Sequence, residues 1–306
     1  MPLHTCPTLT PSQQRQVADL IDISRITDGV SAASEETLLR LDSATGGAWR
    51  HVLATRQGDL VGYAHLDEGD PQAPWAELVV APLRRREGVG SELLAHLRRR
   101  APAVRVWAHG FLPGTANFAV ARHLHVVREL WQMARPLDGL PPGRPLPEGF
   151  EVSTLTPGDA RDEGDWLATN ALAFATHPEQ GRVTLADLRA RQDEPWFDAA
   201  GFFLVRDTRP GPTQGRLAAF HWTKVEHGRG EVYVVGVHPD YQGHGLGSAV
   251  TWIGLDHLRD QGLETVTLYV EGLNAPAIAT YRRLGFERIS LDVQLAAAGV
   301  PADGAR

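Results

Sequence analysis

The stretch that decides the fold reads Val235-Gly236-Val237-His238-Pro239-Asp240-Tyr241-Gln242-Gly243-His244-Gly245-Leu246-Gly247. An apolar run leads into a turn in which glycines alternate, and an amphipathic segment from Ser248 to Leu258 follows directly. The pattern predicts a strand, a tight turn and the start of a helix. Because backbone N–H groups and a helix N-terminus then point at one spot, the turn favours a phosphate or pyrophosphate ligand.

The chain contains this pattern twice. The earlier copy reads Leu78-Val79-Val80-Ala81-Pro82-Leu83-Arg84-Arg85-Arg86-Glu87-Gly88-Val89-Gly90, and its helix runs from Ser91 to Leu97. An offset of 157 positions relates Pro82 to Pro239, Gly88 to Gly245, Gly90 to Gly247 and Asn117 to Asn274. Between the glycines and the asparagines the offset slips by about five residues, which relates 106–109 to 268–271. We therefore predict two homologous domains, each large enough to bury its own core.

Composition and charge narrow the class of protein. The 306 residues are 42% hydrophobic and 22% charged, as is usual for globular proteins. The sequence has no long apolar run and no basic-then-apolar N-terminus, and a single cysteine, Cys6, favours a reducing cytoplasm. A net charge of −7 argues against nucleic-acid binding, although Arg84–Arg86 lies where a phosphate would bind. We expect a cytoplasmic monomer. We expect no metal, because no pair of histidines has the spacing of metal ligands.

The order of predicted elements is the same in both halves. Each half reads as a strand, one or two helices, three strands, the glycine turn with its helix, a strand, a helix and a strand. This order predicts an α/β fold with a mixed sheet and helices on both faces. The Pro- and Gly-rich residues 139–148 are expected to link a first domain, 1–138, to a second, 149–306. From Ala296 onward we expect a frayed tail.

Two motifs connect this reading to a known superfamily. The segment 242–247 resembles the Q/R-x-x-G-x-G/A acyl-CoA loop of the GCN5-related N-acetyltransferase (GNAT) superfamily, and 85–90 is similar. The segment 274–286 resembles the N-x-x-A-x-x-x-Y-x-x-x-G-F motif of the same superfamily. The resemblance implies two tandem GNAT acyltransferase domains and acetyl-CoA as the cosubstrate.

Four further segments, 107–110, 177–181, 220–224 and 230–237, resemble the tandem GNAT enzymes of mycothiol biosynthesis. This resemblance implies acetyl transfer to the cysteinyl amine of 1D-myo-inositol 2-(L-cysteinylamino)-2-deoxy-α-D-glucopyranoside, a small thiol. It implies that the second domain catalyses, while the first binds acetyl-CoA without chemistry. The implied contacts to the acceptor are Asp28, Glu179, Lys224, Glu231, Tyr269 and Tyr281.

The resemblance also implies the residues that contact acetyl-CoA. In the first domain these are Leu78, Val79, Val80, Arg85, Arg86, Glu87, Gly88, Val89, Gly90 and Ser91. In the second domain they are Val235, Gly236, Val237, Gln242, Gly243, His244, Gly245, Leu246, Gly247, Ser248, Asn274, Ala275, Pro276, Ala277, Ile278 and Ala279.

The residues themselves suggest the catalytic groups. Acetyl transfer to an amine requires a neutral amine, a polarised thioester carbonyl and a protonated leaving thiolate. Strand alternation predicts that Glu231, Tyr233 and Val235 share one face, so Glu231 is suited to take the ammonium proton. Tyr281 can donate a proton to the thiolate, and a backbone N–H within 235–237 can bind the oxyanion. The structural alternatives are an exposed glutamate at a strand end and a packed aromatic ring.

The first copy lacks both groups. The offset of 157 places Pro74 opposite Glu231 and Leu124 opposite Tyr281, and neither residue can act as an acid or a base. This difference predicts a single active domain. An acetyltransferase of another amine, such as an aminoglycoside or a protein N-terminus, remains an alternative function. A CoA-sensing protein without catalysis is an alternative of a different class. By their chemistry alone, Asp28 could be a turn residue, and Lys224 and Glu179 ordinary surface residues.

Overall fold

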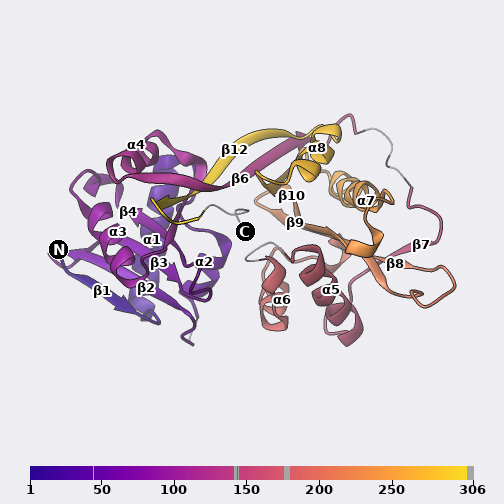
Figure 1. Ribbon diagram of the computed structural model, residues 1–306, viewed down its shortest axis with the longest axis horizontal. Coiled ribbons are helices and arrows are strands. Elements are labelled where there is room, and N and C mark those ends of the chain that lie inside the picture. Colours follow the sequence, from indigo (N-terminus) through magenta and orange to yellow (C-terminus); the bar gives the residue numbers. More distant parts are fainter. Residues whose placement is uncertain (44, 141–142, 144, 176–179, 302–306) are drawn as a thin grey trace. The chain divides into compact units, whose positions relative to one another are not determined.

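The computed structural model describes residues 1–306 except 44, 141–142, 144, 176–179 and 302–306. The chain forms two compact units (Figure 1). The first comprises Met1–Trp131, Glu271–Leu273 and Ser290–Arg306, and the second comprises Gln132–Val270 and Asn274–Ile289. The last segment of the chain therefore belongs to the first unit. Among the described residues of the Pro- and Gly-rich segment 139–148, none lies in a helix or a strand.

The first unit follows the predicted order of elements. These elements are β1 (Leu3–Cys6), α1 (Pro11–Asp28), α2 (Glu35–Leu41), β2 (Trp49–Arg56), β3 (Asp59–Asp67), β4 (Trp75–Val80), α3 (Val89–Arg100), β5 (Arg105–Ala108), α4 (Pro113–Ala121) and β6 (Leu124–Pro136). Local sequence explains the ends of α1: Thr10 and Gln13 form a capping box, and Gly29 ends the helix at φ 75°.

The second unit repeats the order. Its elements are β7 (Phe150–Thr154), α5 (Ala160–Ala173), α6 (Leu185–Gln192), β8 (Phe202–Asp207), β9 (Leu217–Glu226), β10 (Arg229–Val237), α7 (Leu246–Asp260), β11 (Thr265–Glu271), α8 (Ala275–Arg283) and β12 (Glu287–Ala297). Asp159 caps α5 by accepting bonds from the N–H groups of Arg161 and Asp162. The α/β fold with a mixed sheet is confirmed in both units.

The sheet of the first unit runs in the order β1-β2-β3-β4-β5-β12-β6. Strands β1 to β4 pair antiparallel, whereas β4 and β5 are parallel and pair only at Trp75 with Arg105 and at Ala76 with Val106. Because β4 continues to Val80, the two strands diverge after Ala76. Apolar cores cover both faces, one against α3 and the other against α1 and α2.

The sheet of the second unit runs in the order β6-β11-β10-β9-β8-β7. Strands β10 and β11 are parallel and pair only over Gly230–Val232, although β10 continues to Val237. The same divergence thus appears in both units. One core contains Trp166 of α5, Leu188 of α6 and the sheet residue Trp222, and the other contains Leu246 and Val250 of α7.

The structure corrects the register between the two copies. Helices α4 and α8 have the same length and begin at Pro113 and Ala275, an offset of 162. Asn274 is the N-cap of α8, whereas Asn117 lies inside α4, so the predicted match between these asparagines is wrong. The second unit has five extra residues before β11, and no shortening between β11 and α8 restores the offset of 157. The left-handed residues that follow the helices, His123 and Gly285, lie at the same offset of 162.

The predicted tail also begins too early. Strand β12 continues to Ala297, and Ala296 is completely buried. Beyond the strand, the Pro301 carbonyl accepts a hydrogen bond of 3.1 Å from Arg105. Strand pairing with β5, at Val293 with Ala108 and Leu295 with Val106, fixes this segment. The remaining residues, 302–306, lie outside the described part of the chain.

Candidate active site

The two glycine turns have nearly the same backbone conformation. Gln242 has φ −67° and ψ 153°, and Arg85 has φ −69° and ψ 154°. The next residue is left-handed in both turns, with φ 81° at Gly243 and 67° at Arg86. A second left-handed residue precedes each helix, Gly245 before α7 and Gly88 before α3. The repeated glycine pattern therefore encodes a repeated turn.

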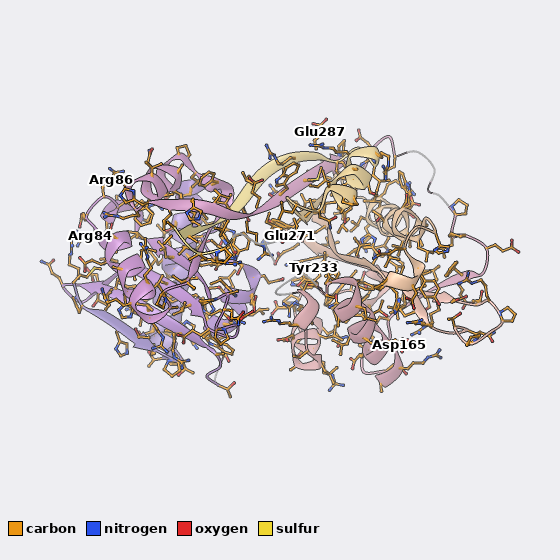
Figure 2. The ribbon with its side chains drawn as sticks, viewed as in Figure 1. Arg84, Arg86, Asp165, Tyr233, Glu271 and Glu287 are labelled. Atoms are coloured by element: carbon orange, nitrogen blue, oxygen red, sulfur yellow. The ribbon has the colours of Figure 1, made fainter. Side chains whose placement is uncertain are left out.

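Both turns leave backbone donors at a helix N-terminus. Within the described residues, neither α3 nor α7 has a side-chain N-cap, whereas Thr10, Asp159 and Thr184 cap α1, α5 and α6. The residues of the second turn that precede α7, 242–245, are all exposed. Figure 2 shows Arg84 and Arg86 at the edge of the first unit. Uncapped N–H groups and the helix dipole favour an anion at each turn.

Strand β10 has a bulge at Tyr233. Its pairing with β9 changes register between Val232 and Val234, so Tyr233 is the extra residue. Tyr233 and Val234 both pack in the core beside α5 and α6, while Val235 and Val237 pack beside α7. The prediction that Glu231, Tyr233 and Val235 share one face is wrong for Val235, because the bulge breaks the alternation.

Glu231 lies opposite Lys224 across β9 and β10, and cross-strand partners project from the same face of a sheet. The Lys224 ammonium lies 4.5 Å from the ring centroid of Trp196 and 5.6 Å from that of Tyr233. It also forms an ion pair of 3.2 Å with Glu226. Tyr233 is labelled in Figure 2, and its hydroxyl accepts a bond of 2.9 Å from Arg191. Glu231 thus lies beside cationic and aromatic groups just before the strands diverge.

Tyr281 lies on α8 and is 9% exposed. Burial raises its pKa to about 12, so the phenol keeps its proton throughout the physiological range. Its ring packs edge-on against Phe286, with centroids 5.8 Å apart. Asn274 holds the start of this helix by accepting a bond of 3.1 Å from Ala277. The end of the helix is held by Arg135, which donates to the Leu284 carbonyl.

The first unit has different residues at the two positions predicted to be catalytic. Glu231 pairs with Lys224 and Thr267, while Trp75 pairs with Asp67 and Arg105, so Trp75 is the structural counterpart of Glu231. The predicted counterpart, Pro74, is wrong by the one residue of the bulge. Across α4 and α8, the counterpart of Tyr281 is Ala119, not Leu124, which begins β6. Neither Trp75 nor Ala119 can transfer a proton.

The other predicted acceptor contacts have diverse surroundings. Both carboxylate oxygens of Asp28, at the end of α1, accept bonds of 2.7 Å from Arg85 in the first glycine turn. Tyr269, on β11, is 44% exposed and accepts a bond of 3.0 Å from Gln132. Glu179 lies outside the described residues. The Asp28 contact shows that this residue holds the first turn to α1.

A buried charged cluster in the first unit was not predicted. His109, after β5, lies 2.9 Å from Glu77 of β4 and 2.9 Å from Asp292 of β12. These residues are far apart in sequence, and only the pairing of β12 with β5 brings Asp292 close. No sequence motif joins these three residues. Within the described residues, no group of three or more metal-ligating side chains could hold a metal ion.

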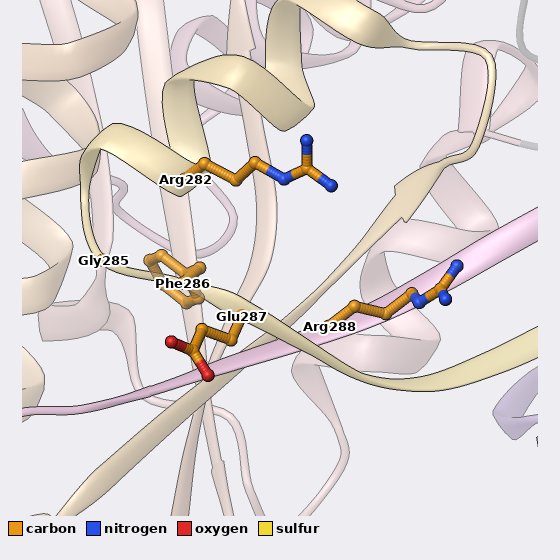
Figure 3. A pocket seen from close by; sticks show the side chains of 5 residues that line it. All are labelled: Arg282, Gly285, Phe286, Glu287 and Arg288. Atoms are coloured by element: carbon orange, nitrogen blue, oxygen red, sulfur yellow. The ribbon is translucent and has the colours of Figure 1, made fainter.

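A surface hollow of about 410 Å³ opens where α8 leads into β12 (Figure 3). It is lined by Arg282, Gly285, Phe286, Glu287 and Arg288. In Figure 3 the Glu287 carboxylate points away from the Arg282 guanidinium. None of the residues assigned to catalysis or to acetyl-CoA lines this hollow. It is therefore a feature separate from the glycine turn and the diverging strands.

The fold and the turn define an N-acetyltransferase of the acyl-CoA-dependent kind. A model described as "Acetyltransferase (GNAT) family" matches residues 19–125 and 166–286. A mycothiol acetyltransferase of Thermomonospora curvata is 50% identical over 289 residues, covering 93% of this chain and 94% of that protein. One from Streptomyces coelicolor is 47% identical over 293 residues, covering 93% and 91%. The chain thus belongs to the mycothiol acetyltransferase family within the GNAT acetyltransferases.

Solved structures show the same tandem architecture. A tandem GNAT protein from the clavulanic acid biosynthesis pathway matches with a TM-score of 0.69 and 21% identity, covering 96% of this chain and 98% of that one. A GCN5-related N-acetyltransferase from Sphaerobacter thermophilus matches with a TM-score of 0.67 and 23% identity, covering 96% and 94%. At these levels of identity, the two matches show that the fold is shared. Among the described residues, no helix is long and apolar enough to cross a membrane.

Proposed function

We propose that this enzyme transfers the acetyl group of acetyl-CoA to the cysteinyl amine of 1D-myo-inositol 2-(L-cysteinylamino)-2-deoxy-α-D-glucopyranoside, which yields mycothiol. The observation that carries the proposal is the asymmetry between two similar units. Both have the anion-binding turn and diverging strands, but only the second has a carboxylate and a phenol at the two catalytic positions, Glu231 and Tyr281. The relatives named mycothiol acetyltransferases supply the acceptor.

The proposed cofactor site is the second glycine turn with the divergent edge of β10. Residues 242–248 hold the pyrophosphate through backbone N–H groups, and 274–279 contact the pantetheine arm. The pantetheine lies along Val235–Val237, where β10 is no longer paired with β11. A backbone N–H in this stretch donates to the thioester oxygen, and the bond strengthens as that oxygen becomes an oxyanion.

Glu231 is the proposed base. It takes a proton from the cysteinyl ammonium, directly or through a water molecule, and the neutral amine then attacks the thioester carbon. A C–N bond forms and the carbonyl oxygen gains negative charge. The C=O bond then re-forms while the C–S bond breaks to release CoA thiolate, and the nitrogen loses its second proton, which ends on the sulfur as CoA thiol. Lys224 lies opposite Glu231 in the pairing of β9 with β10, so its side chain projects from the same face of the sheet.

Tyr281 is the proposed donor to the leaving thiolate. Its pKa of about 12 lies above the ordinary thiol value of about 8.5, so complete transfer of its proton to the thiolate is unfavourable. A hydrogen bond from the phenol to sulfur has no such penalty and stabilises the charge as the C–S bond breaks. Tyr281 therefore acts first as a hydrogen-bond donor to the sulfur, and the thiolate is protonated afterwards to give CoA thiol.

The acceptor contacts proposed in the second unit are Lys224, Glu231, Tyr269 and Glu179, and Asp28 is proposed from the resemblance alone. A sugar-inositol with a free ammonium needs several hydrogen-bonding groups and at least one carboxylate. In this structure Asp28 forms an ion pair with Arg85. It can therefore bind the acceptor only by sharing its carboxylate with Arg85 or by breaking that pair. The first unit is proposed to bind acetyl-CoA at 78–80 and 85–91 without turnover.

The test is an assay of the purified chain with acetyl-CoA and the cysteinyl pseudodisaccharide, following CoA thiol release and product mass. We expect a single N-acetylation at a rate far above that for free cysteine. Acetylation of another amine, such as an aminoglycoside or a peptide N-terminus, with none of the pseudodisaccharide would overturn the acceptor assignment. Binding of acetyl-CoA without turnover on any amine would indicate a CoA sensor instead.

A further inference from the structure

Asp207, at the end of β8, is completely buried and is surrounded by donors. Its carboxylate accepts bonds from the Arg209 backbone N–H at 3.0 Å and from the Arg209 guanidinium at 2.7 and 2.8 Å. It also accepts from the Thr213 hydroxyl at 2.9 Å. Hydrogen bonds from Arg209 hold the Asp207 pKa well below its ordinary value, so the carboxylate is charged at any physiological pH.

One further bond connects this carboxylate to the acetyl-CoA turn. The Tyr241 hydroxyl donates to Asp207 over 2.9 Å, and Tyr241 directly precedes Gln242, the first residue of the glycine turn. The Tyr241 ring is 4% exposed and packs with Leu246 and Val250 at the start of α7. The Arg209 guanidinium lies 5.8 Å from the ring centroid of Tyr241. Tyr241 therefore joins the loop between β8 and β9 to the beginning of the turn.

The same loop holds the turn at a second place. Arg216 donates to the Asp240 carboxylate over 2.9 Å and lies 2.7 Å from the His238 ring nitrogen. His238 in turn accepts a bond of 3.1 Å from the Asp240 N–H. Every residue from His238 to Tyr241 except Pro239 is thus connected to this loop or to a neighbour in the turn.

The first unit holds its turn differently. The counterpart of Tyr241 is Arg84, and the loop between β2 and β3 is reduced to Gln57 and Gly58. There the turn is held by the ion pairs of Arg85 with Asp28 and of Arg56 with Glu87. The anchor on Asp207 is therefore specific to the unit that has the catalytic groups.

We propose that Asp207 and Tyr241 are positioning residues that order the second glycine turn before acetyl-CoA binds. The backbone N–H groups of a turn bind a pyrophosphate well only when they already point to one spot, since ordering them during binding opposes affinity. Loss of the Tyr241 bond leaves the contacts with the pyrophosphate intact but makes the turn less ordered. The inference rests on the proposed use of this turn for acetyl-CoA.

The first test is Tyr241→Phe in the full chain, which removes only the hydroxyl. We expect the KM for acetyl-CoA to rise about 3- to 10-fold, the effect of one ordinary hydrogen bond. The KM for the acceptor and kcat at saturating acetyl-CoA should change less than 2-fold. Asp207→Asn should act in the same direction and more strongly, because its carboxylate binds several donors. A general loss of folding would lower kcat and would not separate the two KM values in this way.

A matched control exists in the first unit. Tyr63, on β3 of the unit that lacks Glu231 and Tyr281, is 2% exposed, and its hydroxyl lies 2.7 Å from a ring nitrogen of His51. Tyr63→Phe removes a buried hydroxyl of the same kind and should leave the KM for acetyl-CoA unchanged. An unchanged KM in Tyr241→Phe, or equal changes in both Tyr variants, would overturn the proposal.

A binding measurement separates this inference from the proposed function. Calorimetric titration with CoA requires no acceptor, so it reports on the turn even if the pseudodisaccharide is not a substrate. Relative to the wild type and Tyr63→Phe, Tyr241→Phe should show one weakened CoA site. Identical isotherms for all three proteins would refute the anchor, whatever the acceptor is.

Discussion

Asp292 of β12 lies 2.9 Å from Nδ1 of His109, and its other carboxylate oxygen accepts a bond of 2.7 Å from the Gly110 N–H. On the opposite side of the ring, Nε2 lies 2.9 Å from Glu77, which is 2% exposed. Burial alone would lower the pKa of His109, but the bonds to the two carboxylates outweigh it and raise the pKa to about 10. Burial would raise the pKa of Glu77, yet the bond to His109 keeps it below its ordinary value. The cluster is therefore a buried imidazolium between carboxylates.

This cluster predicts a pH-dependent stability. His109 binds its proton more tightly in the folded state, so its contribution is complete below its ordinary pKa of 6.5 and is lost as pH rises through about 10. The full shift corresponds to about 5 kcal/mol at most. The contribution of Glu77 to stability has the opposite dependence on pH, because it is lost as pH falls into the acid range. Thermal unfolding of His109→Gln should therefore depend less on pH between 7 and 10 than unfolding of the wild type. His125→Gln, at an exposed position of β6, should keep the wild-type dependence, and equal slopes in all three proteins would contradict the prediction.

Glu231→Gln should lower kcat about 10²- to 10⁴-fold, the usual effect of losing one acid–base group. The amide keeps the shape of the side chain but cannot accept the ammonium proton, so the KM for acetyl-CoA should change little. Steady-state kinetics with both substrates measure this. Glu226→Gln, two residues beyond Lys224 on β9, is the control for a changed charge near the site and should keep most of the activity. Wild-type turnover in Glu231→Gln would refute the assignment of the base.

Tyr281→Phe should lower kcat, and the size of the defect should depend on the leaving group. If the phenol stabilises the thiolate by a hydrogen bond, the loss is about 10- to 100-fold with acetyl-CoA. It should shrink with an acetyl thioester of a more acidic thiol, whose anion needs less stabilisation. Kinetics with two such donors test this. The same defect with both donors would indicate that the Tyr281 hydroxyl does not act on the departing thiol.

Arg86→Glu should weaken CoA binding at the first turn about 10-fold or more, because it places a carboxylate beside Glu87 at a site proposed for pyrophosphate. Calorimetry should show one weakened site, with kcat nearly unchanged. Arg99→Glu makes the same change of charge at the other end of α3 and should not alter binding. Complete loss of acetylation in Arg86→Glu would contradict the division between a binding unit and a catalytic unit.

Gly254→Ala tests the packing behind β9. A methyl group at Gly254 would lie 2.1 Å from the ring of His221, which is completely buried and lies 2.9 Å from the Val250 carbonyl. Because this ring cannot move into solvent, we expect a loss of about 1–3 kcal/mol in the free energy of unfolding. At Gly164, in helix α5, an added methyl group would have no atom within 4 Å. Gly164→Ala should therefore raise the free energy of unfolding by about 0.5–1 kcal/mol. Denaturant unfolding of both variants gives the comparison.

Local sequence was sufficient for most of the fold. The strands and helices follow the predicted order in both units, and the two glycine turns have the predicted relation to α3 and α7. Hydrophobic alternation and turn residues act over a few positions, so a single chain reveals them. The position of β12 in the first unit depends on pairing between residues nearly two hundred positions apart, for which periodicity has no signal.

The register of the candidate site could not be predicted from the sequence. Glu231 and Tyr281 were proposed because each lies in a recognisable motif, whereas their counterparts in the first unit were placed wrongly. A one-residue bulge at Tyr233 and an uncompensated loop before β11 move those counterparts to Trp75 and Ala119. Likewise, Asp207 was missed as the support of the turn because its carboxylate reaches Tyr241 across the sheet. Insertions and long-range hydrogen bonds are fixed by packing, which a motif does not contain.

Most of β12, the last strand of the chain, belongs to the first unit, and this has a consequence for biosynthesis. A ribosome makes the chain from its N-terminus, so β1 to β5 are complete long before Ser290–Ala297 exists. Until then, the first unit lacks both the strand that pairs with β5 and the Asp292 carboxylate that faces His109. The second unit, which consists of residues 132–270 and 274–289, has all its strands earlier. The half that is translated first is thus the half whose last strand is made last.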